Sequence, residues 1–261
     1  GLWFLLLRNS LSSKHSFGIF MDNEFFIGPV LSSISSSFLK GEWPLRMNTI
    51  LGGLPLYNFA QLSPFYSLYF TLLPIFKNPI EVIHSLHWIT IIHLLIFEIN
   101  TYIFLRVNKI SCFSSVIGGA LVASSANSFS YAGWVNLLAP YSWLPLYLAG
   151  VIGILKNYRS PYYFIAAIGG IVFLSQSSPS QPLIHAFFIT SIFTSIRCLE
   201  LFINNKKKSI LYILIQLAAL AIIAFLLVAP VIIPVTFEFK NMIRWIGDFP
   251  AISGNNPIPF N

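Results

Sequence analysis

The chain has 261 residues, of which 56% are hydrophobic and 9% are charged, and its mean hydropathy is +0.76. About a quarter of the residues in a soluble domain are charged, so this composition excludes an ordinary water-facing surface. The net charge of +7 comes from basic residues scattered between apolar runs, which indicates membrane topology and argues against nucleic-acid binding. We therefore expect an all-α polytopic membrane protein.

The chain opens inside an apolar run, "GLWFLLLRN". This run is shorter than the roughly 20 residues that cross a bilayer, and it lacks the basic region and the cleavage site of a signal peptide. We expect it to be the end of a first transmembrane helix. On this interpretation residues 1–261 form a single transmembrane domain, a fragment in which the first helix is truncated and a C-terminal part is missing.

A long loop, 10–81, follows this run, and loops of such length are usually functional. Its segment 62–76 is apolar but short and bracketed by prolines, so we expect it to be re-entrant or interfacial. Apolar segments that are long enough to span a bilayer, or nearly so, follow the loop. They cover about 82–105, 113–133, 139–155, 161–176, 182–203 and 210–234.

Basic residues mark three of the short connections: Arg106 with Lys109, Lys156 with Arg159, and the run 204–208. All three lie on one side if each segment crosses once. Short loops rich in Lys and Arg stay in the cytoplasm, so the loop 10–81 is predicted to be extracytoplasmic.

Two carboxylates, Asp22 and Glu24, stand early in this loop, directly before the segment 28–39. Apolar residues recur at helical spacing in that segment, with serines on the other face, and a proline suits its first turn. The apolar positions are Val30, Leu31, Ile34 and Phe38. We expect a helix that either lies flat on the outer leaflet or packs as an ordinary loop helix, and that holds both carboxylates near the headgroups.

The stretch 39–74 carries two spaced motifs. Gly41, Pro44, Leu45, Asn48, Gly52, Gly53 and Pro55 match a "G-x-x-P-L-W-N-P-x-x-x-G-G-x-P" signature, and Gln61, Phe65 and Tyr66 match "Q-x-x-x-F-Y-P". Here the sequence resembles the YfhO family of bacterial membrane proteins, which belong with the GT-C type glycosyltransferases. Residues 141–151 and 229–244 are similar to two further family segments. The chain departs from the family at Arg46–Met47, where members have Trp, and at 178–181, where "SPSQ" replaces "G-H-P-Q".

The resemblance implies a GT-C-like bundle of transmembrane helices with a long first extracytoplasmic loop that carries interfacial helices. It implies an enzyme of the bacterial cytoplasmic membrane that takes a sugar from a polyprenyl-phosphate donor and passes it to a glycan, lipid or protein acceptor of the cell envelope. Acidic residues after the first helix are the usual base in such enzymes, and Asp22 and Glu24 occupy that place. The positions expected to bind substrate are Asn48, Gln61, Tyr66, Glu238 and Arg244, which lie in the matching segments, and Arg46, a basic residue of the predicted outer side.

A carboxylate can accept the proton of an attacking acceptor hydroxyl, and apolar neighbours such as 25–27 would raise its pKa toward neutrality. Residues two apart do not share a helix face, so Asp22 and Glu24 need a turn to converge. We expect Asp22 to be the base, while Glu24 would orient the acceptor or hold a divalent cation. Without the family resemblance, two solvated loop charges are the alternative.

The phosphate leaving group calls for positive charge, and four basic residues lie on the predicted outer side, where each is equally suited to anchor the chain at the interface. They are Lys40, Arg46, Lys240 and Arg244. The run Glu81, His84 and His87 has the spacing of a metal-binding helix face but lacks a second acidic set. The tryptophans, among them Trp43 and Trp143, are expected in an interfacial belt.

Two other functions remain open. A transporter or lipid flippase would concentrate charges and broken helices near the membrane midplane, where Glu98 is almost alone in this sequence. A polytopic assembly protein without catalysis is the third alternative.

Overall fold

The structure is a computed structural model that describes residues 23–47, 54–57, 62–76, 78–84, 86–156, 160–179 and 181–238. The predictions that fall on 1–22, 48–53, 58–61 and 239–261 lie outside the described residues. These predictions include the first transmembrane helix and Asp22.

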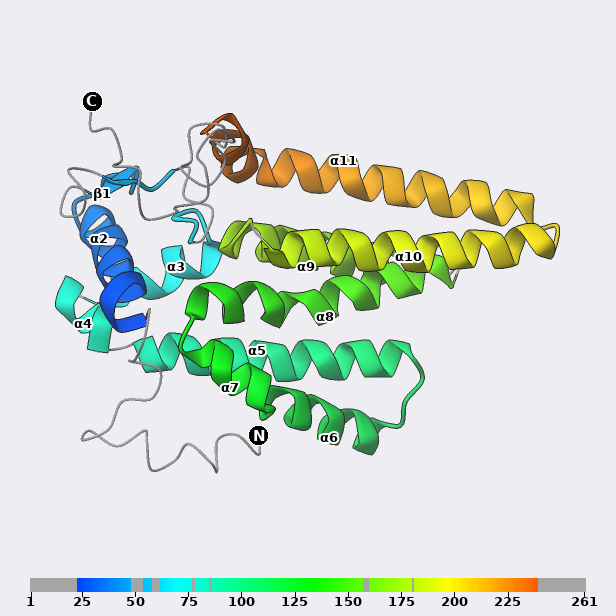
Figure 1. Cartoon of the computed structure of the whole chain (residues 1–261), viewed down its shortest axis with the longest axis horizontal. Helices are drawn as coiled ribbons and strands as arrows, with labels where there is room; N and C mark the ends of the chain where they lie inside the picture. Colours follow the sequence, from blue (N-terminus) through cyan, green and yellow to red (C-terminus); the bar gives the residue numbers. More distant parts are fainter. Residues whose placement is uncertain are drawn as a thin grey trace, which may run out of the picture.

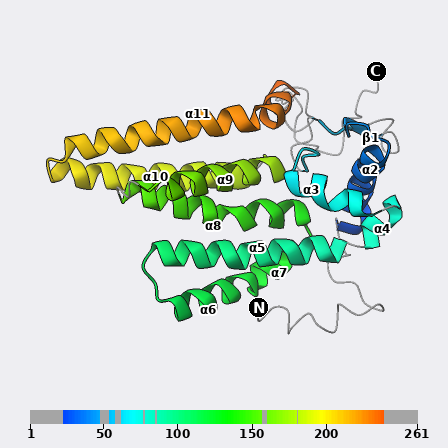
Figure 2. The ribbon, with the colours of Figure 1, turned by 180° about the vertical axis from the view of Figure 1, so that it is seen from behind.

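Long helices run side by side as a bundle, and shorter elements form a cap over one end of it (Figure 1). The bundle contains α5 (Leu86–Val107), α6 (Cys112–Ala123), α7 (Ala126–Ala132), α8 (Val135–Leu155), α9 (Pro161–Ser177), α10 (Gln181–Ile203) and α11 (Lys207–Glu238). The cap contains the π-helix η2 (Asn23–Ile27), α2 (Gly28–Leu39), α3 (Ser67–Leu72), the 3-10 helix η3 (Leu73–Ile75), α4 (Pro79–His84) and the antiparallel pair β1 (Arg46–Met47) and β2 (Leu54–Pro55). The view from behind shows the same separation of cap and bundle (Figure 2).

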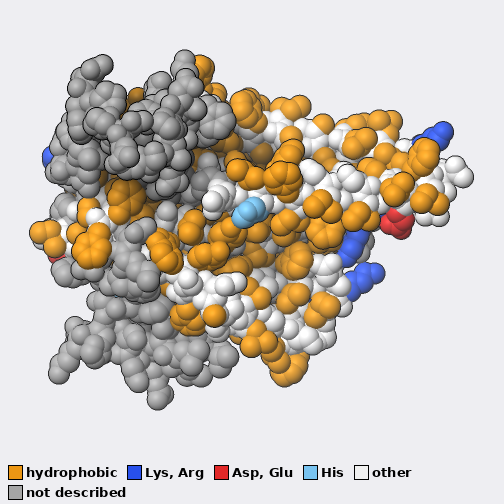
Figure 3. All heavy atoms as spheres, viewed as in Figure 1, with side chains coloured by type: hydrophobic (Ala, Val, Ile, Leu, Met, Phe, Trp, Pro, Cys, Tyr) orange, Lys and Arg blue, Asp and Glu red, His pale blue; other side chains and the backbone are white. Residues whose placement is uncertain are grey.

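The connections α5–α6, α8–α9 and α10–α11 lie at the bundle end away from the cap (Figures 1 and 2). Arg106, Lys109, Lys156 and the lysines 206–208 belong to these connections or flank them, and basic side chains gather at that end of the surface (Figure 3). The described basic residues of these connections therefore share one end, as the sequence predicts, and the described part of the long loop lies at the other. Arg159 lies outside the described residues.

Four helices of the described part are long and apolar enough to cross a membrane: α5, α8, α10 and α11. Only 11% of the apolar span of α10 and 28% of that of α11 are buried inside the protein. Many hydrophobic side chains lie on this part of the surface (Figure 3). Exposure of so much apolar surface is unfavourable in water but favourable in the lipid of a membrane. The chain therefore has the helices of a multi-pass membrane protein.

The predicted span 113–133 is interrupted in the structure. α6 ends at Ala123, and α7 begins after a bend of 47°. The Ser125 hydroxyl accepts a hydrogen bond from the Ser128 backbone N–H and so caps α7. A serine that caps a new helix competes with continuation of the old one, which explains the break. With α6 and α7 counted as one span, the described residues contain five candidates.

Glycines bring α8 and α9 into close contact. A Cβ atom built at Gly170 of α9 would lie 2.6 Å from the Cα of Tyr147 in α8, and one built at Gly150 of α8 would lie 2.7 Å from the Cα of Ala167 in α9. Both positions therefore exclude any side chain. Small residues at helix interfaces let backbones approach closely, which is how helices pack when lipid removes the hydrophobic driving force between them.

The segment 28–39 is a packed loop helix, the second of the two predicted arrangements. Val30, Leu31 and Ile34 are fully buried in a core that α2 shares with other cap elements and with α5 and α8. Protein rather than lipid thus covers the apolar face of α2. The segment 62–76, predicted to be re-entrant or interfacial, forms α3 and η3 within the same cap.

Candidate functional site

Several predicted site residues cannot be placed. Asp22, Asn48, Gln61, Lys240 and Arg244 lie outside the described residues, and for Glu24 and Glu238 the structure describes the backbone alone. Glu24 belongs to η2, and Glu238 ends α11. The base and most of the substrate-binding positions therefore stay predictions.

Asn23, between the two acidic residues, anchors the cap to the bundle. Its side chain is fully buried. The Nδ2 group donates a hydrogen bond of 2.7 Å to the Ala132 carbonyl, and Oδ1 accepts one of 3.0 Å from the Val135 N–H. Both partners flank the turn between α7 and α8. Because Asn23 is covalently joined to Asp22 and Glu24, a carboxylate-bearing residue adjoins this fixed point on each side.

The apolar residues after the acidic pair are oriented unequally. Ile27 is fully buried and Phe26 is partly buried, whereas Phe25 is 77% exposed. Two of the three predicted apolar neighbours thus pack into the cap core. Phe25 points outward and is free to contact lipid or a lipid-linked substrate.

Tyr66 lies at the centre of a buried hydrogen-bond chain between the cap, α5 and α8. Trp143 donates its indole N–H to the Tyr66 hydroxyl oxygen at 2.7 Å, and the hydroxyl meets His93 Nε2 at 3.0 Å. His93 Nδ1 lies 2.7 Å from the Ile89 carbonyl, which only accepts, so Nδ1 carries the proton. In the neutral ring, Nε2 then accepts a hydrogen bond from the Tyr66 hydroxyl. Every polar side-chain group in this series of hydrogen bonds thus has a partner.

This arrangement gives Tyr66 a structural role. Its ring is fully buried, and burial raises the pKa of its hydroxyl well above the ordinary value, so the group stays protonated and able to donate. Tyr66 was predicted to bind substrate, but it presents no surface to a ligand. Its hydrogen bonds position the cap on the bundle, and substrate binding at Tyr66 stays a prediction.

Tyr66→Phe is expected to destabilise the fold by about 2–4 kcal/mol, because Trp143 and His93 each lose a partner in a buried place. Tyr69→Phe is the matched control, since the Tyr69 hydroxyl is buried and has no hydrogen-bond partner among the described residues. We expect the control to be neutral or stabilising. Thermal unfolding in detergent measures both, and equal midpoints for the two variants would contradict the proposed chain.

A second polar tether joins the cap to the end of α9. The Ser67 hydroxyl donates to Gln176 Oε1 at 2.6 Å, and the Ser63 N–H donates to the Ser177 carbonyl at 3.3 Å. Together with Asn23 and Tyr66, these bonds tie the cap to several helices of the bundle. The cap is therefore a fixed part of the fold.

Arg46 lies away from Asn23, the described residue between the two predicted bases. It is exposed on β1, which follows the C-terminal end of α2, whereas Asn23 precedes the N-terminal end. A helix of 12 residues such as α2 is about 18 Å long. Arg46 and the exposed Lys40 thus lie near the far end of the cap from Asn23.

The run Glu81, His84 and His87, whose spacing suits a metal-binding helix face but which lacks a second acidic set, is divided between two helices. Glu81 is on α4 and His87 on α5, with residue 85 between them outside the description. In the described part of the chain, no group of three or more His, Cys, Asp or Glu residues is placed to hold a metal ion. The prediction that Glu24 holds a divalent cation stays untested, because the Glu24 side chain lies outside the description.

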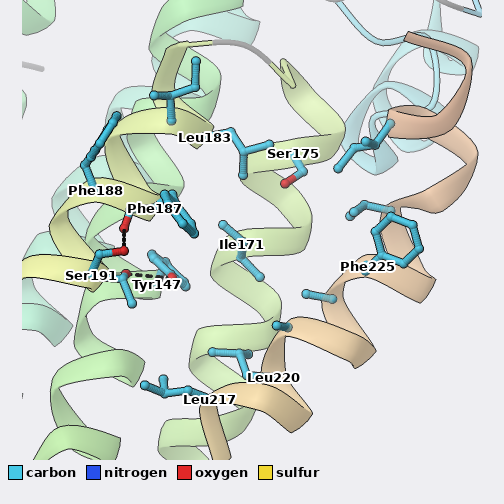
Figure 4. Close-up of a pocket in the computed structure, with 16 residues that line it drawn as sticks. Tyr147, Ile171, Ser175, Leu183, Phe187, Phe188, Ser191, Leu217, Leu220 and Phe225 are labelled. Carbon is cyan, nitrogen blue, oxygen red and sulfur yellow. Dashed lines mark hydrogen bonds between the residues drawn. The ribbon is translucent and has the colours of Figure 1, made fainter. Parts of the chain in front are cut away.

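A groove of about 710 Å³ lies among α8, α9, α10 and α11 (Figure 4). Its walls are almost entirely apolar, with Ile171, Leu217 and Leu220 on one side and Phe187 and Phe188 on the other. Phe187 and Phe188 are 68% and 59% exposed, so the groove is open to the side of the bundle.

The few polar groups of the groove are mostly satisfied within the protein. The Tyr147 hydroxyl pairs with Thr190 Oγ1 at 2.8 Å, and the Ser191 hydroxyl donates to the Phe187 carbonyl (Figure 4). The Ser175 hydroxyl is buried and has no partner among the described residues. The groove thus offers a long hydrocarbon surface, which suits an acyl or isoprenoid chain lying in the bilayer.

Sequence reasoning missed Asn23, His93 and the bonding of Trp143. His93 is one of few polar residues inside an apolar helix, and such a residue in a membrane span usually pairs with another polar group. That signal could have directed attention to it. Trp143, expected in an interfacial belt, is instead partly buried and stacks on Phe173 at 4.4 Å between ring centroids.

Comparison of the chain with protein-family models, with curated proteins and with solved structures gives no match in any of the three.

Proposed function

We propose that the protein is a membrane glycosyltransferase of GT-C type that acts on the extracytoplasmic face. It transfers a sugar from a polyprenyl-phosphate donor to a cell-envelope acceptor, with Asp22 or Glu24 as the base. The observation that carries the proposal is the anchor at Asn23. It fixes the chain between two carboxylate-bearing residues, at the end of the bundle opposite the basic connections.

The sugar transfer requires a base for the acceptor hydroxyl and a group that stabilises the leaving phosphate. The acceptor hydroxyl attacks the anomeric carbon, a new C–O bond forms, and the bond between that carbon and the phosphate oxygen breaks with its electron pair on the phosphate. A carboxylate accepts the hydroxyl proton. Negative charge then develops on the lipid phosphate, which a cation or N–H donor would stabilise. Lys240 and Arg244 are the candidates that the resemblance and the topology favour, whereas Arg46 lies near the far end of α2 from Asn23.

The apolar groove supports a lipid-linked donor. It runs along α10 and α11, whose outer faces are the least covered of the candidate spans, so a chain dissolved in the bilayer could enter from the side. C-terminal parts of α9 and α11 lie near the cap (Figure 1). A lipid chain bound in the groove would place its phosphate toward the cap end of the bundle, where Asn23 is anchored.

Vesicles that contain the purified protein, a polyprenyl-phosphate donor with a labelled sugar and an envelope extract as acceptor test the proposal. We expect label to leave the carrier and appear in an acceptor product. Label that changes leaflet while it stays on the carrier would establish a flippase instead. Label that neither moves nor transfers would leave the non-catalytic assembly protein as the better account.

A further inference from the structure

A recess of about 270 Å³ opens on the cap at the C-terminal end of α2. It is lined by Phe38, Gly41, Glu42, Trp43 and Phe70. Trp43 is 65% exposed and Glu42 is exposed as well. An aromatic residue and a carboxylate, both open to the surroundings, thus share one small hollow that the proposed transfer chemistry does not use.

A rigid turn presents these two residues. The Gly41 N–H donates to the Phe38 carbonyl at 3.0 Å, and the Glu42 N–H donates to the Ser37 carbonyl at 2.9 Å, the paired bonds that close a helix around a left-handed residue. Gly41 has φ +70°, and a Cβ built on it would meet nothing within 4 Å. The turn therefore fixes the backbone of Glu42 and Trp43 and leaves space above Gly41.

Aromatic contacts hold the Trp43 ring in place from the side. Its centroid lies 5.9 Å from that of Phe70 at an interplanar angle of 68°, and 6.3 Å from that of Phe65. Phe38 and Phe70 pack on each other at 4.7 Å. An edge contact of this kind leaves aromatic surface of Trp43 uncovered, in agreement with its exposure.

Hydrogen-bonding groups stand beside this surface. Within the described residues, neither the Glu42 carboxylate nor the Trp43 indole N–H has a hydrogen-bond partner. The recess thus combines an apolar ring, an acceptor and a donor. A sugar ring matches all three, because its C–H face packs on an indole, its hydroxyls donate to a carboxylate, and its oxygens accept from an N–H.

A quaternary ammonium group fits less well. Such a cation is bound by several aromatic faces that surround it. Phe38 and Phe70 pack their rings against each other, so these rings do not surround a ligand. The Trp43 indole N–H would also face the ammonium group, which cannot accept a hydrogen bond. The chemistry of the recess favours a neutral sugar.

We propose that the recess binds one sugar ring of an acceptor glycan, away from the reacting end. Its role in transfer rests on the proposed function. α2, about 18 Å long, separates the recess from the anchored Asn23, which adjoins the proposed base, so the bound ring is not the one that reacts. The recess would hold an extended acceptor at a second point and so favour long glycans over single sugars.

The test is saturation-transfer NMR on the protein in lipid nanodiscs, free of glycoside detergents, with a panel of neutral mono- and disaccharides. We expect saturation of sugar C–H protons, and binding about tenfold weaker in Trp43→Ala and in Glu42→Gln. Trp88→Ala is the control, because Trp88 is 48% exposed on α5 outside the recess and should bind sugars as the wild type does. Failure of every sugar to bind, binding unchanged in Trp43→Ala, or binding of tetramethylammonium in place of sugars would overturn the proposal.

Acceptor kinetics separate this proposal from the function on which it rests. Trp43→Ala should raise KM more for an extended acceptor glycan than for a monosaccharide acceptor. Sugar binding at Trp43 in a protein that transfers nothing would retain the recess and reject the transferase. Transfer with equal sugar binding in Trp43→Ala and the wild type would retain the transferase and reject the recess.

Discussion

Gly170→Ala is expected to destabilise the protein by about 1–3 kcal/mol, the usual cost of overpacking a close contact. The added methyl would meet the backbone of Tyr147, with 2.6 Å to its Cα, and no rotamer change relieves a clash with backbone. α8 and α9 must therefore move apart. Because Tyr147 also lines the apolar groove, the same change should lower sugar transfer.

Gly169→Ala, one residue earlier in α9, is the matched control. A Cβ at Gly169 meets nothing within 4 Å, and alanine stabilises a helix by up to about 1 kcal/mol relative to glycine. The two variants should thus shift the unfolding midpoint in opposite directions. Thermal unfolding in detergent measures the shifts, and a Gly170→Ala protein as stable as the Gly169→Ala protein would refute the close contact between α8 and α9.

Asn23→Ala is expected to release the cap from the turn between α7 and α8. The Ala132 carbonyl and the Val135 N–H would lose their partners, at a cost of about 1–3 kcal/mol for each buried group. Amide hydrogen exchange at Val135 measures the change directly, because Asn23 Oδ1 is the group that accepts its N–H. We expect faster exchange at Val135 and reduced sugar transfer.

Asn127→Ala controls for the removal of an amide near the same turn. Asn127 lies on α7 and is exposed, so its loss should change neither the exchange at Val135 nor the transfer rate. Unaltered exchange at Val135 in Asn23→Ala would show that the cap is held to the bundle by other contacts alone.

The positions of the membrane-spanning helices could be predicted from the sequence, because a lipid bilayer strongly limits which segments can cross it. A span needs a long apolar run, and basic connections mark one side, so the positions of α5, α8, α10 and α11 and the common end of the basic connections followed from local composition. The helix 28–39 was also readable, since its period and Pro29 are local signals.

Features that depend on tertiary contact were not readable. The break after Ala123 comes from Ser125, which caps a new helix, and a serine in the sequence does not by itself show whether a helix begins after it. The pairings of Asn23 with the α7–α8 turn and of Tyr66 with Trp143 join residues 77 to 112 positions apart. Only the fold brings such residues together. The motif predicts that Tyr66 binds substrate, whereas its burial and its hydrogen bonds to Trp143 and His93 could be found only from the fold.

For the candidate site, too, the sequence predicted which residues are involved but not how they are arranged in space. The family resemblance predicts that Asp22 and Glu24 carry chemistry, because residue type and place alone fit solvated loop charges as well, and the structure adds the fixed point between them. Arg46, grouped with them by sequence, lies near the other end of α2. Residues that are close in sequence can thus lie far apart in space, because α2, a helix of about 18 Å, stands between Asn23 and Arg46.

The most direct test of the account is sugar transfer from a polyprenyl-phosphate donor by the wild type, Asp22→Asn and Glu24→Gln at matched expression and membrane insertion. Each substitution preserves side-chain size and removes the charge. The account predicts a loss of about a hundredfold or more in one variant, the usual scale of general-base catalysis, with Asp22→Asn the one expected. Full transfer in both variants would contradict a carboxylate base in the first loop.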